Sequence, residues 1–393
     1  MQLTFFDSYS AWQKMLPLTY TRPVAEIRVG ILKIHEKWQK ILGGKATSFR
    51  TRAYLNNLFP VPETKSLTIL SNVLPTRELI KTFSTIVGNE VVVSRGQLIA
   101  GYFNPNEEFI VGSREKIEIE NIENINYPWD IFSKNRGEII KDYELITKDR
   151  TSEGLKDEHT KTYGEDIFLE EGTKIKAAVL NAENGPIYLG KGSEIQDGAL
   201  IRGPFVLGDQ SVVNMGAKMR GGTTIGPCSK VGGEISNSVI QGYSNKGHEG
   251  YLGNSVLGEW CNLGAGTNNS NLKNNYANVK MWDFENDKFK DTGLQFCGLI
   301  MGDHSKCGIN TMFNTGTNVG VSANIFGENF LKGLIPSFVW GGASGFLTYQ
   351  IGKVFETAEL VMSRRDKELT KDYKAMLSHI FETTSKYRIW ESK

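Results

Sequence analysis

Aliphatic residues recur at every sixth position through the middle of the chain. A second run resumes this period after an interruption. A six-residue period suits short extended segments joined by tight turns, each placing one side chain inward on the coil beneath. The pattern therefore predicts a β-solenoid. The first run is Leu189, Ile195, Ile201, Leu207, Val213, Met219, Ile225 and Val231, and the second is Met301, Cys307, Phe313, Val319 and Ile325.

The regions on either side of the repeats have different patterns. Before them, residues 67–70 and 91–93 predict short buried strands, and residues 28–42 predict a helix ending at Gly43. After them, apolar residues at helical spacing predict one long amphipathic helix, whose arginines and lysines form a solvated face. The expected domains are an α/β domain over 1–150, a solenoid over 165–345 and a C-terminal amphipathic helix over 346–393.

Composition supports repeated turns and argues against polyanionic partners. Of the 42 glycines, 30 fall between Gly185 and Gly345. The 45 Lys and Arg against 44 Asp and Glu leave a net charge of +1, so we expect neither nucleic acid nor a membrane as partner. The first residues lack the basic and apolar regions of a signal peptide, and the four cysteines show no CxxC spacing. We expect a cytoplasmic protein with reduced thiols.

The segment LPLTYTRPV, which ends at Val24, resembles part of the opening of sugar-1-phosphate nucleotidyltransferases. In that family a glycine-rich loop precedes this segment, and a lysine after it meets the sugar phosphate. This chain has FDSYS, without glycine, at the loop position, and Val24 in place of the lysine. Side chains with a Cβ obstruct the close approach of several amides to phosphate. We therefore expect a degenerate front domain that has lost catalysis and needs Mg only if it is active.

An aliphatic residue followed by a small one is also the pattern of hexapeptide-repeat acyltransferases, which the region of about residues 165–330 resembles. Their repeats form a three-sided left-handed β-helix, and they assemble as trimers with active sites between neighbouring coils. The resemblance implies a homotrimer. The expected fold class is thus a truncated nucleotidyltransferase-like α/β domain, followed by a left-handed parallel β-helix and a C-terminal α-helix.

The interruption at 242–251 is expected to project from the solenoid as a functional loop, because insertions into solenoids usually map to one edge. Together with the stretch after it, this region resembles the family of the bifunctional N-acetylglucosamine-1-phosphate uridylyltransferase/glucosamine-1-phosphate acetyltransferase, a GlmU-like pattern. The comparable family segment reads K-A-x-H-x-x-Y-x-G-D, then N-I-G-A-G-T, then an asparagine. The residues in step with it include Lys246, His248, Tyr251, Asn262, Gly264 and Asn271.

His248 is the expected catalytic base. A sugar ammonium must lose a proton before it attacks a thioester, and an imidazole, which titrates near pH ~6.5, can accept that proton. The resemblance also implies contacts to the sugar acceptor and to acetyl-CoA or another acyl-CoA as co-substrate. The expected substrate-binding residues are Arg220, Lys246, Tyr251, Asn262, Asn271 and Lys273, and the expected cofactor-binding residues are Gly264, Ala265, Ile309, Asn310 and Thr311.

Several functions stay open. The acceptor stays open between an amino-sugar phosphate and a nucleotide amino sugar, because two phosphate-binding lysines of the family are absent or moved, one of them near Ser236. A γ-class carbonic anhydrase uses the same solenoid but binds zinc through three histidines, and the repeats hold only His248 and His304; no metal site is expected. A bifunctional enzyme with an active front domain also stays open, as does a non-catalytic protein that binds a nucleotide sugar or serves as a scaffold.

Overall fold

The computed structural model describes residues 2–44 and 46–392. The chain divides into two compact units. The first unit extends to Ile27 and includes Leu32–Tyr127, and the second contains Arg28–Ile31 and the chain from Pro128 onward. Within the described residues, no helix is long and apolar enough to cross a membrane.

The first unit is an α/β domain built on a six-stranded sheet in the order β2-β1-β3-β6-β5-β7. β1, β2 and β3 are parallel, whereas β6 runs antiparallel to both of its neighbours. The two predicted strands are confirmed as β3 and β5. The bounds are β1 (Gln2–Phe6), β2 (Ala46–Arg50), β3 (Ser66–Leu70), β5 (Glu90–Ser94), β6 (Gln97–Phe103), β7 (Glu115–Glu118), α1 (Tyr9–Lys14), α2 (Ile34–Leu42) and α3 (Arg77–Thr85), with a small pair β4 (Val73–Leu74) and β8 (Glu123–Asn124).

The predicted helix at 28–42 is shorter than expected. α2 begins at Ile34, ends at Leu42 and is capped by Gly43, where a φ of 66° makes glycine the favoured residue. The segment Arg28–Ile31 belongs to the second unit, where the Ile31 amide donates to the Asp142 carboxylate at 2.8 Å. Those residues therefore bond to α4 (Pro128–Thr147) instead of extending α2.

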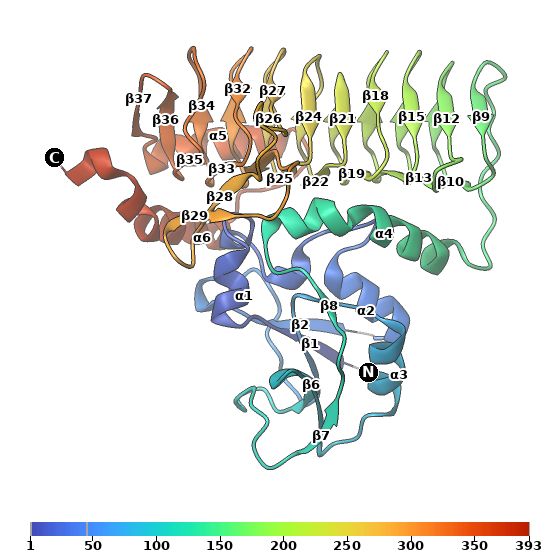
Figure 1. Cartoon of the computed structure of the whole chain (residues 1–393), viewed down its shortest axis with the longest axis vertical. Coiled ribbons are helices and arrows are strands. Elements are labelled where there is room, and N and C mark those ends of the chain that lie inside the picture. The colour runs from blue at the N-terminus through green and yellow to red at the C-terminus, as the bar shows by residue number, and fades with distance from the viewer. Residues whose placement is uncertain (1, 45, 393) are drawn as a thin grey trace. The chain divides into compact units, whose positions relative to one another are not determined.

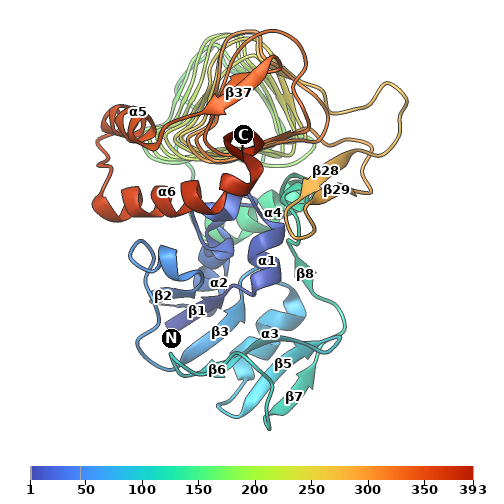
Figure 2. The ribbon, with the colours of Figure 1, turned by 90° about the vertical axis from the view of Figure 1, so that its left-hand side faces the viewer.

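The second unit is a parallel β-helix with three sides (Figures 1 and 2). The nine-stranded side consists of β10 (Ile167–Leu169), β13 (Ile187–Leu189), β16 (Phe205–Leu207), β19 (Thr223–Ile225), β22 (Val239–Gly242), β25 (Val256–Glu259), β30 (Leu299–Met301), β33 (Thr317–Val319) and β35 (Leu334–Ile335). The ten-stranded side consists of β11 (Lys174–Ile175), β14 (Glu194–Ile195), β17 (Val212–Val213), β20 (Lys230–Val231), β23 (Asn245–Lys246), β26 (Asn262–Leu263), β31 (Lys306–Cys307), β34 (Asn324–Ile325), β36 (Val339–Gly342) and β37 (Gly345–Thr348). The third side consists of β9 (Lys161–Tyr163), β12 (Val179–Asn181), β15 (Leu200–Arg202), β18 (Lys218–Met219), β21 (Glu234–Ser236) and β24 (Tyr251–Gly253), followed by the pair β27 (Asn268–Asn269) and β32 (Met312–Phe313).

The six-residue register is confirmed. All thirteen predicted inward residues are buried in one continuous interior cluster. Leu189 pairs with Leu207, and Leu207 pairs with Ile225, so three six-residue segments make one coil. Burial of these aliphatic side chains is the main contribution to the stability of such a stack.

The interruption at 242–251 does not project as a loop. It contains β23, which pairs with β20 and β26, and the inward column continues through it at Lys246. The projecting insertion lies further along the chain, between β27 and β30. It carries the hairpin of β28 (Lys280–Asp283) and β29 (Lys288–Asp291), which stands out from one side of the coil (Figure 2).

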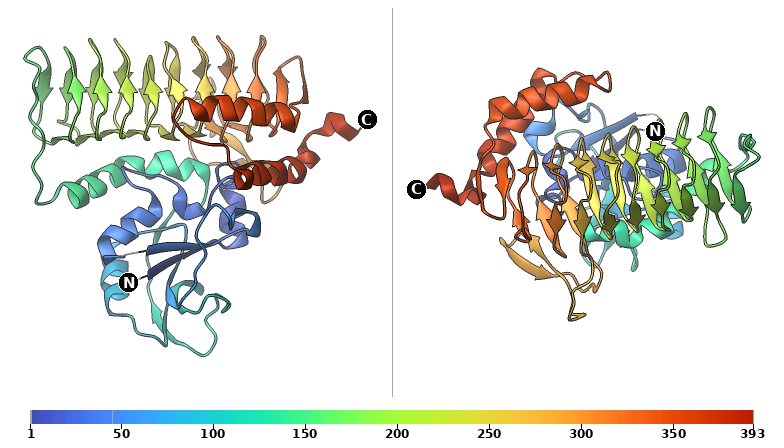
Figure 3. Two further views of the ribbon diagram at one scale, coloured as in Figure 1. Left: turned by 180° about the vertical axis from the view of Figure 1, so that it is seen from behind. Right: turned by 90° about the horizontal axis from the view of Figure 1, so that it is seen from above.

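Helices cover the sides of the β-helix. α4 packs on the nine-stranded side, where the Asn135 amide donates to the Gly222 carbonyl at 2.8 Å. The predicted single C-terminal helix consists of two helices, α5 (Ile351–Ser363) and α6 (Lys371–Thr383) (Figure 3). They are separated at Asp366, which has a φ of 53°, and Thr370 caps α6. A left-handed residue and a new N-cap end one helix and start another.

The last coil is closed by a reversed strand and by the C-terminal residues. β37 pairs with β36 in the antiparallel direction. Trp390 packs against Phe346 and the interior cluster, and its indole N–H donates to the Thr348 hydroxyl at 3.0 Å. Arg388 is buried and contacts Glu391 through its Nε at 2.8 Å. In Figure 2, which looks along the axis of the β-helix, β37 and the C-terminal end of the chain lie over the end of the stack.

Candidate active site

A groove of about 710 Å³ runs across the outer face of the ten-stranded side. Successive residues in a strand point to opposite faces. In β20, β23, β26 and β31 the second residue faces the interior, so the first faces the groove. These four outward residues are Lys230, Asn245, Asn262 and Lys306.

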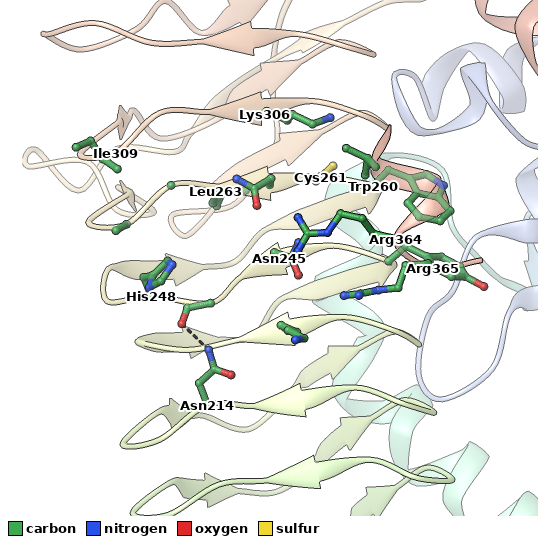
Figure 4. A pocket seen from close by; sticks show the side chains of 17 residues that line it. Asn214, Asn245, His248, Trp260, Cys261, Leu263, Lys306, Ile309, Arg364 and Arg365 are labelled. Atoms are coloured by element: carbon green, nitrogen blue, oxygen red, sulfur yellow. Dashed lines mark hydrogen bonds between the residues drawn. The ribbon is translucent and has the colours of Figure 1, made fainter. Parts of the chain in front are cut away.

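His248 lies at one edge of this groove, at the corner between β23 and β24 (Figure 4). The side chain is exposed. The corner is held from the coil below, because the Asn214 amide donates to the Gly247 carbonyl at 2.7 Å. The Lys246 ammonium holds it from inside the coil, donating to the His248 carbonyl at 2.5 Å. A base on a fixed corner beside a concave groove is suited to proton transfer.

The sequence predicts that Lys246 contacts substrate, but the structure places it inside the coil. The side chain is only 1% exposed and occupies the inward position between Val231 and Leu263. Burial lowers its pKa to about 8. Lys246 is therefore a supporting group beneath His248, and its ammonium does not face the groove.

Four of the other expected substrate residues fall into two places. Asn262 lines the same groove as His248. Arg220, Tyr251 and Asn271 do not line it. Tyr251 and Asn271 meet on the third side, where the Asn271 amide donates to the Tyr251 hydroxyl at 3.1 Å. Arg220 pairs with Glu234 on that same side at 2.9 Å.

Lys273 lies apart from both groups. It follows β27, near the base of the hairpin insertion, and its ammonium donates to the Asn278 carbonyl at 2.8 Å. One chain thus presents two separate sets of the expected residues, one in the groove and one on the third side.

The expected cofactor residues are also divided. Gly264, Ala265 and Ile309 line the groove. Asn310 takes a left-handed backbone conformation, with a φ of 57°, and its main-chain N–H donates to the Ala265 carbonyl at 2.7 Å. Thr311 is buried, and its hydroxyl donates to the Gly308 carbonyl at 2.8 Å. The last two therefore shape the corner beside the groove without lining it.

The edge of the groove opposite His248 contains residues that the sequence did not single out (Figure 4). Trp260 stacks on Tyr243, with ring centroids 4.3 Å apart, and both line the groove. Arg364 and Arg365, at the end of α5, line it as well, although the sequence predicts only a solvated face there. The six-residue register could have identified two further groove residues, Lys230 and Lys306. Each directly precedes an inward residue and therefore faces outward.

The two histidines of the β-helix lie at opposite edges of the ten-stranded side. His304 lies two residues before β31. Its ring stacks on that of Trp260, with ring centroids 6.1 Å apart, and makes a 2.9 Å hydrogen bond with the Tyr373 hydroxyl. Within residues 2–44 and 46–392, no group of three or more His, Cys, Asp or Glu is placed to hold a metal ion.

In the first unit, the place of the glycine-rich loop is taken by a buried carboxylate and a short helix. Asp7 follows β1 and accepts hydrogen bonds from the Val24 amide, at 3.2 Å, and from the Thr51 hydroxyl. Burial raises the pKa of Asp7 to about 6. Ser8 then caps α1, accepting from the Ala11 amide at 3.2 Å. The loop position is thus filled by the protein's own polar groups.

Comparisons with known proteins agree with the resemblance seen in the sequence. Residues 3–151 match a family model described as sugar nucleotidyl transferase. The chain is 35% identical over 162 residues to a bifunctional sugar-1-phosphate nucleotidylyltransferase/acetyltransferase of Sulfurisphaera tokodaii, covering 40% of this chain and 37% of that protein. It is 36% identical over 88 residues to the bifunctional protein GlmU of Methanocaldococcus jannaschii, covering 22% and 21%.

A third relative is the bifunctional protein GlmU of Methanococcus aeolicus, 28% identical over 137 residues, with 34% of this chain and 29% of that protein covered. The chain thus matches less than two fifths of the length of each of these relatives. The chain is therefore GlmU-like, with a sugar nucleotidyltransferase-like front domain followed by a parallel β-helix.

Proposed function

We propose that this protein is a transferase that moves an acyl group from an acyl-CoA, acetyl-CoA in the first instance, to the amine of an amino-sugar phosphate or a nucleotide amino sugar. The observation that carries the proposal is His248, fixed at the edge of a groove of about 710 Å³ that Asn262 also lines. The acetyltransferase in the name of the Sulfurisphaera tokodaii relative supports the same reaction class.

The proposed chemistry needs one base. As the amine nitrogen attacks the thioester carbon, the His248 imidazole takes the proton that the nitrogen releases. The tetrahedral intermediate then collapses, the carbon–sulfur bond breaks, and the imidazolium returns its proton to the leaving thiolate. The Asn262 amide is placed in the same groove to orient a sugar hydroxyl or the amine by hydrogen bonding.

A homotrimer would join the two separate sets of expected residues. Tyr251 and Asn271 face away from the groove of their own chain, on the third side. In a closed three-fold assembly, the third side of one chain can face the groove of its neighbour. The corner that carries His248 also has exposed apolar side chains, including Met215 and Ile309, each 71% exposed. Large exposed apolar side chains beside a functional site are typical of an interface.

For the front domain we propose a nucleotidyltransferase fold without nucleotidyl transfer. The buried Asp7 carboxylate would repel a nucleotide phosphate, and the adjacent Ala11 amide is already bonded to Ser8. Active nucleotidyl transfer is the second candidate, because residues 3–151 match the sugar nucleotidyl transferase model. Mg is a cofactor only in that second case.

The test is a thiol-release assay with acetyl-CoA and a panel of amino sugars, their phosphates and nucleotide amino sugars. We expect turnover with at least one acceptor and a loss of about 100- to 10,000-fold in His248→Ala. The control is His159→Ala, which removes a histidine that is 75% exposed in its side chain and lies far along the sequence from the groove residues. The base assignment fails if His248→Ala keeps more than about a tenth of the rate. Failure of every acceptor, with every acyl-CoA tried, would favour a non-catalytic binding protein.

A further inference from the structure

Positive charge lines the groove both on its strands and at the edge opposite His248, and proton transfer does not use it. Lys230, Lys306, Arg364 and Arg365 all line it, whereas none of its described lining residues is an Asp or Glu. Within the described chain none of the four forms an ion pair with a carboxylate. Cations gathered in a concave site without counter-charges attract anions.

The geometry of α5 explains only part of this cluster. Arg364 is the C-cap of α5, and cations at a helix C-terminus interact favourably with its unpaired carbonyl groups. That explanation does not cover Lys230 and Lys306, which come from two different strands of the β-helix. The Lys306 ammonium donates to the His304 carbonyl at 2.9 Å, burial lowers its pKa to about 8, and a bound anion would raise that pKa again.

Figure 4 shows how the ends of the groove differ. His248 and Ile309 lie at one edge, Arg364 and Arg365 lie at the other, and Asn245 lies between them. A ligand that fills this groove therefore needs a reactive end, a middle that can bond to amides, and an anionic end. An acyl-CoA has this order, with its thioester, its amide-containing arm and its phosphorylated ADP.

We propose that the arginine pair at the end of α5, with Lys230 and Lys306, binds the phosphates of a nucleoside diphosphate, namely the phosphorylated ADP end of the acyl-CoA. The identity of this donor rests on the proposed acyl transfer. Guanidinium groups suit this task because they bind phosphate oxygens in pairs. The C-terminal helix α5 then fixes the donor, which leaves the thioester at His248.

A nucleotide sugar carries the same diphosphate chemistry, so the test must separate the two sources. Binding of CoA, of CoA lacking its 3′-phosphate, and of UDP-N-acetylglucosamine to the full-length protein is measured by calorimetry. We expect CoA to bind most tightly, and Arg364→Gln/Arg365→Gln to weaken it at least about tenfold. Lys353→Gln is the matched control. It removes an exposed positive charge from the same helix, and that charge pairs with Glu356. Lys230→Gln, at an exposed strand position, provides a second variant if the double variant unfolds.

Kinetics give an independent readout. In the double variant the KM for acetyl-CoA should rise about tenfold or more, whereas kcat, the KM for the acceptor, and kcat/KM for acetyl-pantetheine should not change. Unchanged CoA affinity in both variants overturns the proposal. Arginine-dependent binding of the nucleotide sugar without binding of CoA overturns the donor assignment. Arginine-dependent CoA binding without transfer to any acceptor supports this anion site and counts against the proposed function, so the two failures are distinguishable.

Discussion

The ammonium of Lys246, inside the coil, donates a hydrogen bond of 2.5 Å to the main-chain carbonyl of His248, whose side chain is exposed. Lys246 replaces the aliphatic residue found at most inward positions of the stack. A buried charge reduces stability unless it is well paired. The presence of Lys246 at an inward position is explained if its ammonium fixes the main chain of His248, the proposed base.

Lys246→Met tests this relationship. We expect kcat for acyl transfer to fall about 10- to 100-fold with little change in KM, because small misplacements of a base reduce rates by such factors. At pH 7 the variant should be at least as stable as the unmutated protein, by up to about 4 kcal/mol, because an apolar side chain replaces a buried cation. A purely structural lysine would instead give lower stability with unchanged kcat.

The same variant has a distinctive dependence on pH. The pKa of Lys246 is lowered to about 8 in the folded protein, whereas an unfolded lysine titrates near about 10.4. Between these values the unfolded chain binds more protons, so this residue makes the stability of the unmutated protein rise with pH. The stability advantage of Lys246→Met should therefore shrink from pH 8 to pH 10. Thermal unfolding of both proteins across this range measures the difference, and a constant difference contradicts the prediction.

The pH dependence of the acyl-transfer rate checks the role of His248. Only the neutral imidazole accepts a proton, so kcat/KM should rise with pH through an ionisation that His248→Ala lacks. His159→Ala should retain the full profile, because that histidine is exposed and lies outside the groove. An identical profile in His248→Ala would assign the ionisation to the substrate amine.

Assembly is tested at the corner that carries His248. Light scattering at micromolar concentration should give the mass of a trimer, and Met215→Lys should reduce both the trimer and the acyl-transfer rate, because it puts a charge into an apolar contact. Leu360→Lys, at a side chain that is 70% exposed on α5, is the control and should remain trimeric. A monomeric unmutated protein with full activity would exclude a site shared between chains.

The front domain should release no measurable pyrophosphate from UTP or dTTP with hexose 1-phosphates and Mg. The reason is the buried Asp7 carboxylate, bonded to the Val24 amide, at the position that the family resemblance assigns to the glycine-rich loop. Weak binding of a nucleotide sugar without turnover is compatible with this expectation. Sustained turnover would instead make the protein a bifunctional enzyme.

The repeat pattern predicted the solenoid because each inward position of a β-helix requires a similar side chain, from Leu189 to Ile325. The strict period missed the coils between Val231 and Leu263 because their turns are shorter and one inward residue, Lys246, is polar. The sequence pattern did not predict the break between α5 and α6. The left-handed conformation of Asp366 causes this break, but it does not change the spacing of the apolar residues.

The candidate site was predictable only where it follows a local motif. His248, Asn262 and Gly264 lie within a short family-like stretch, and they do line one groove. Arg364 lies about a hundred residues further along the chain, and only the fold brings it to the same groove. In the proposed trimer Tyr251 would face His248 of another chain, a relationship that no local motif of one sequence encodes.

The reversed strand β37 and the C-terminal residues over it determine where the stack of coils stops. Without them, the last parallel strand would present a row of unpaired amides and carbonyls in the spacing that another coil requires. A chain that ends after Gly342 should therefore polymerise end to end into fibres, with each molecule templating the next. Trp390 and Arg388 therefore belong to a C-terminal cap. This cap prevents further coils from adding to the end of the β-helix.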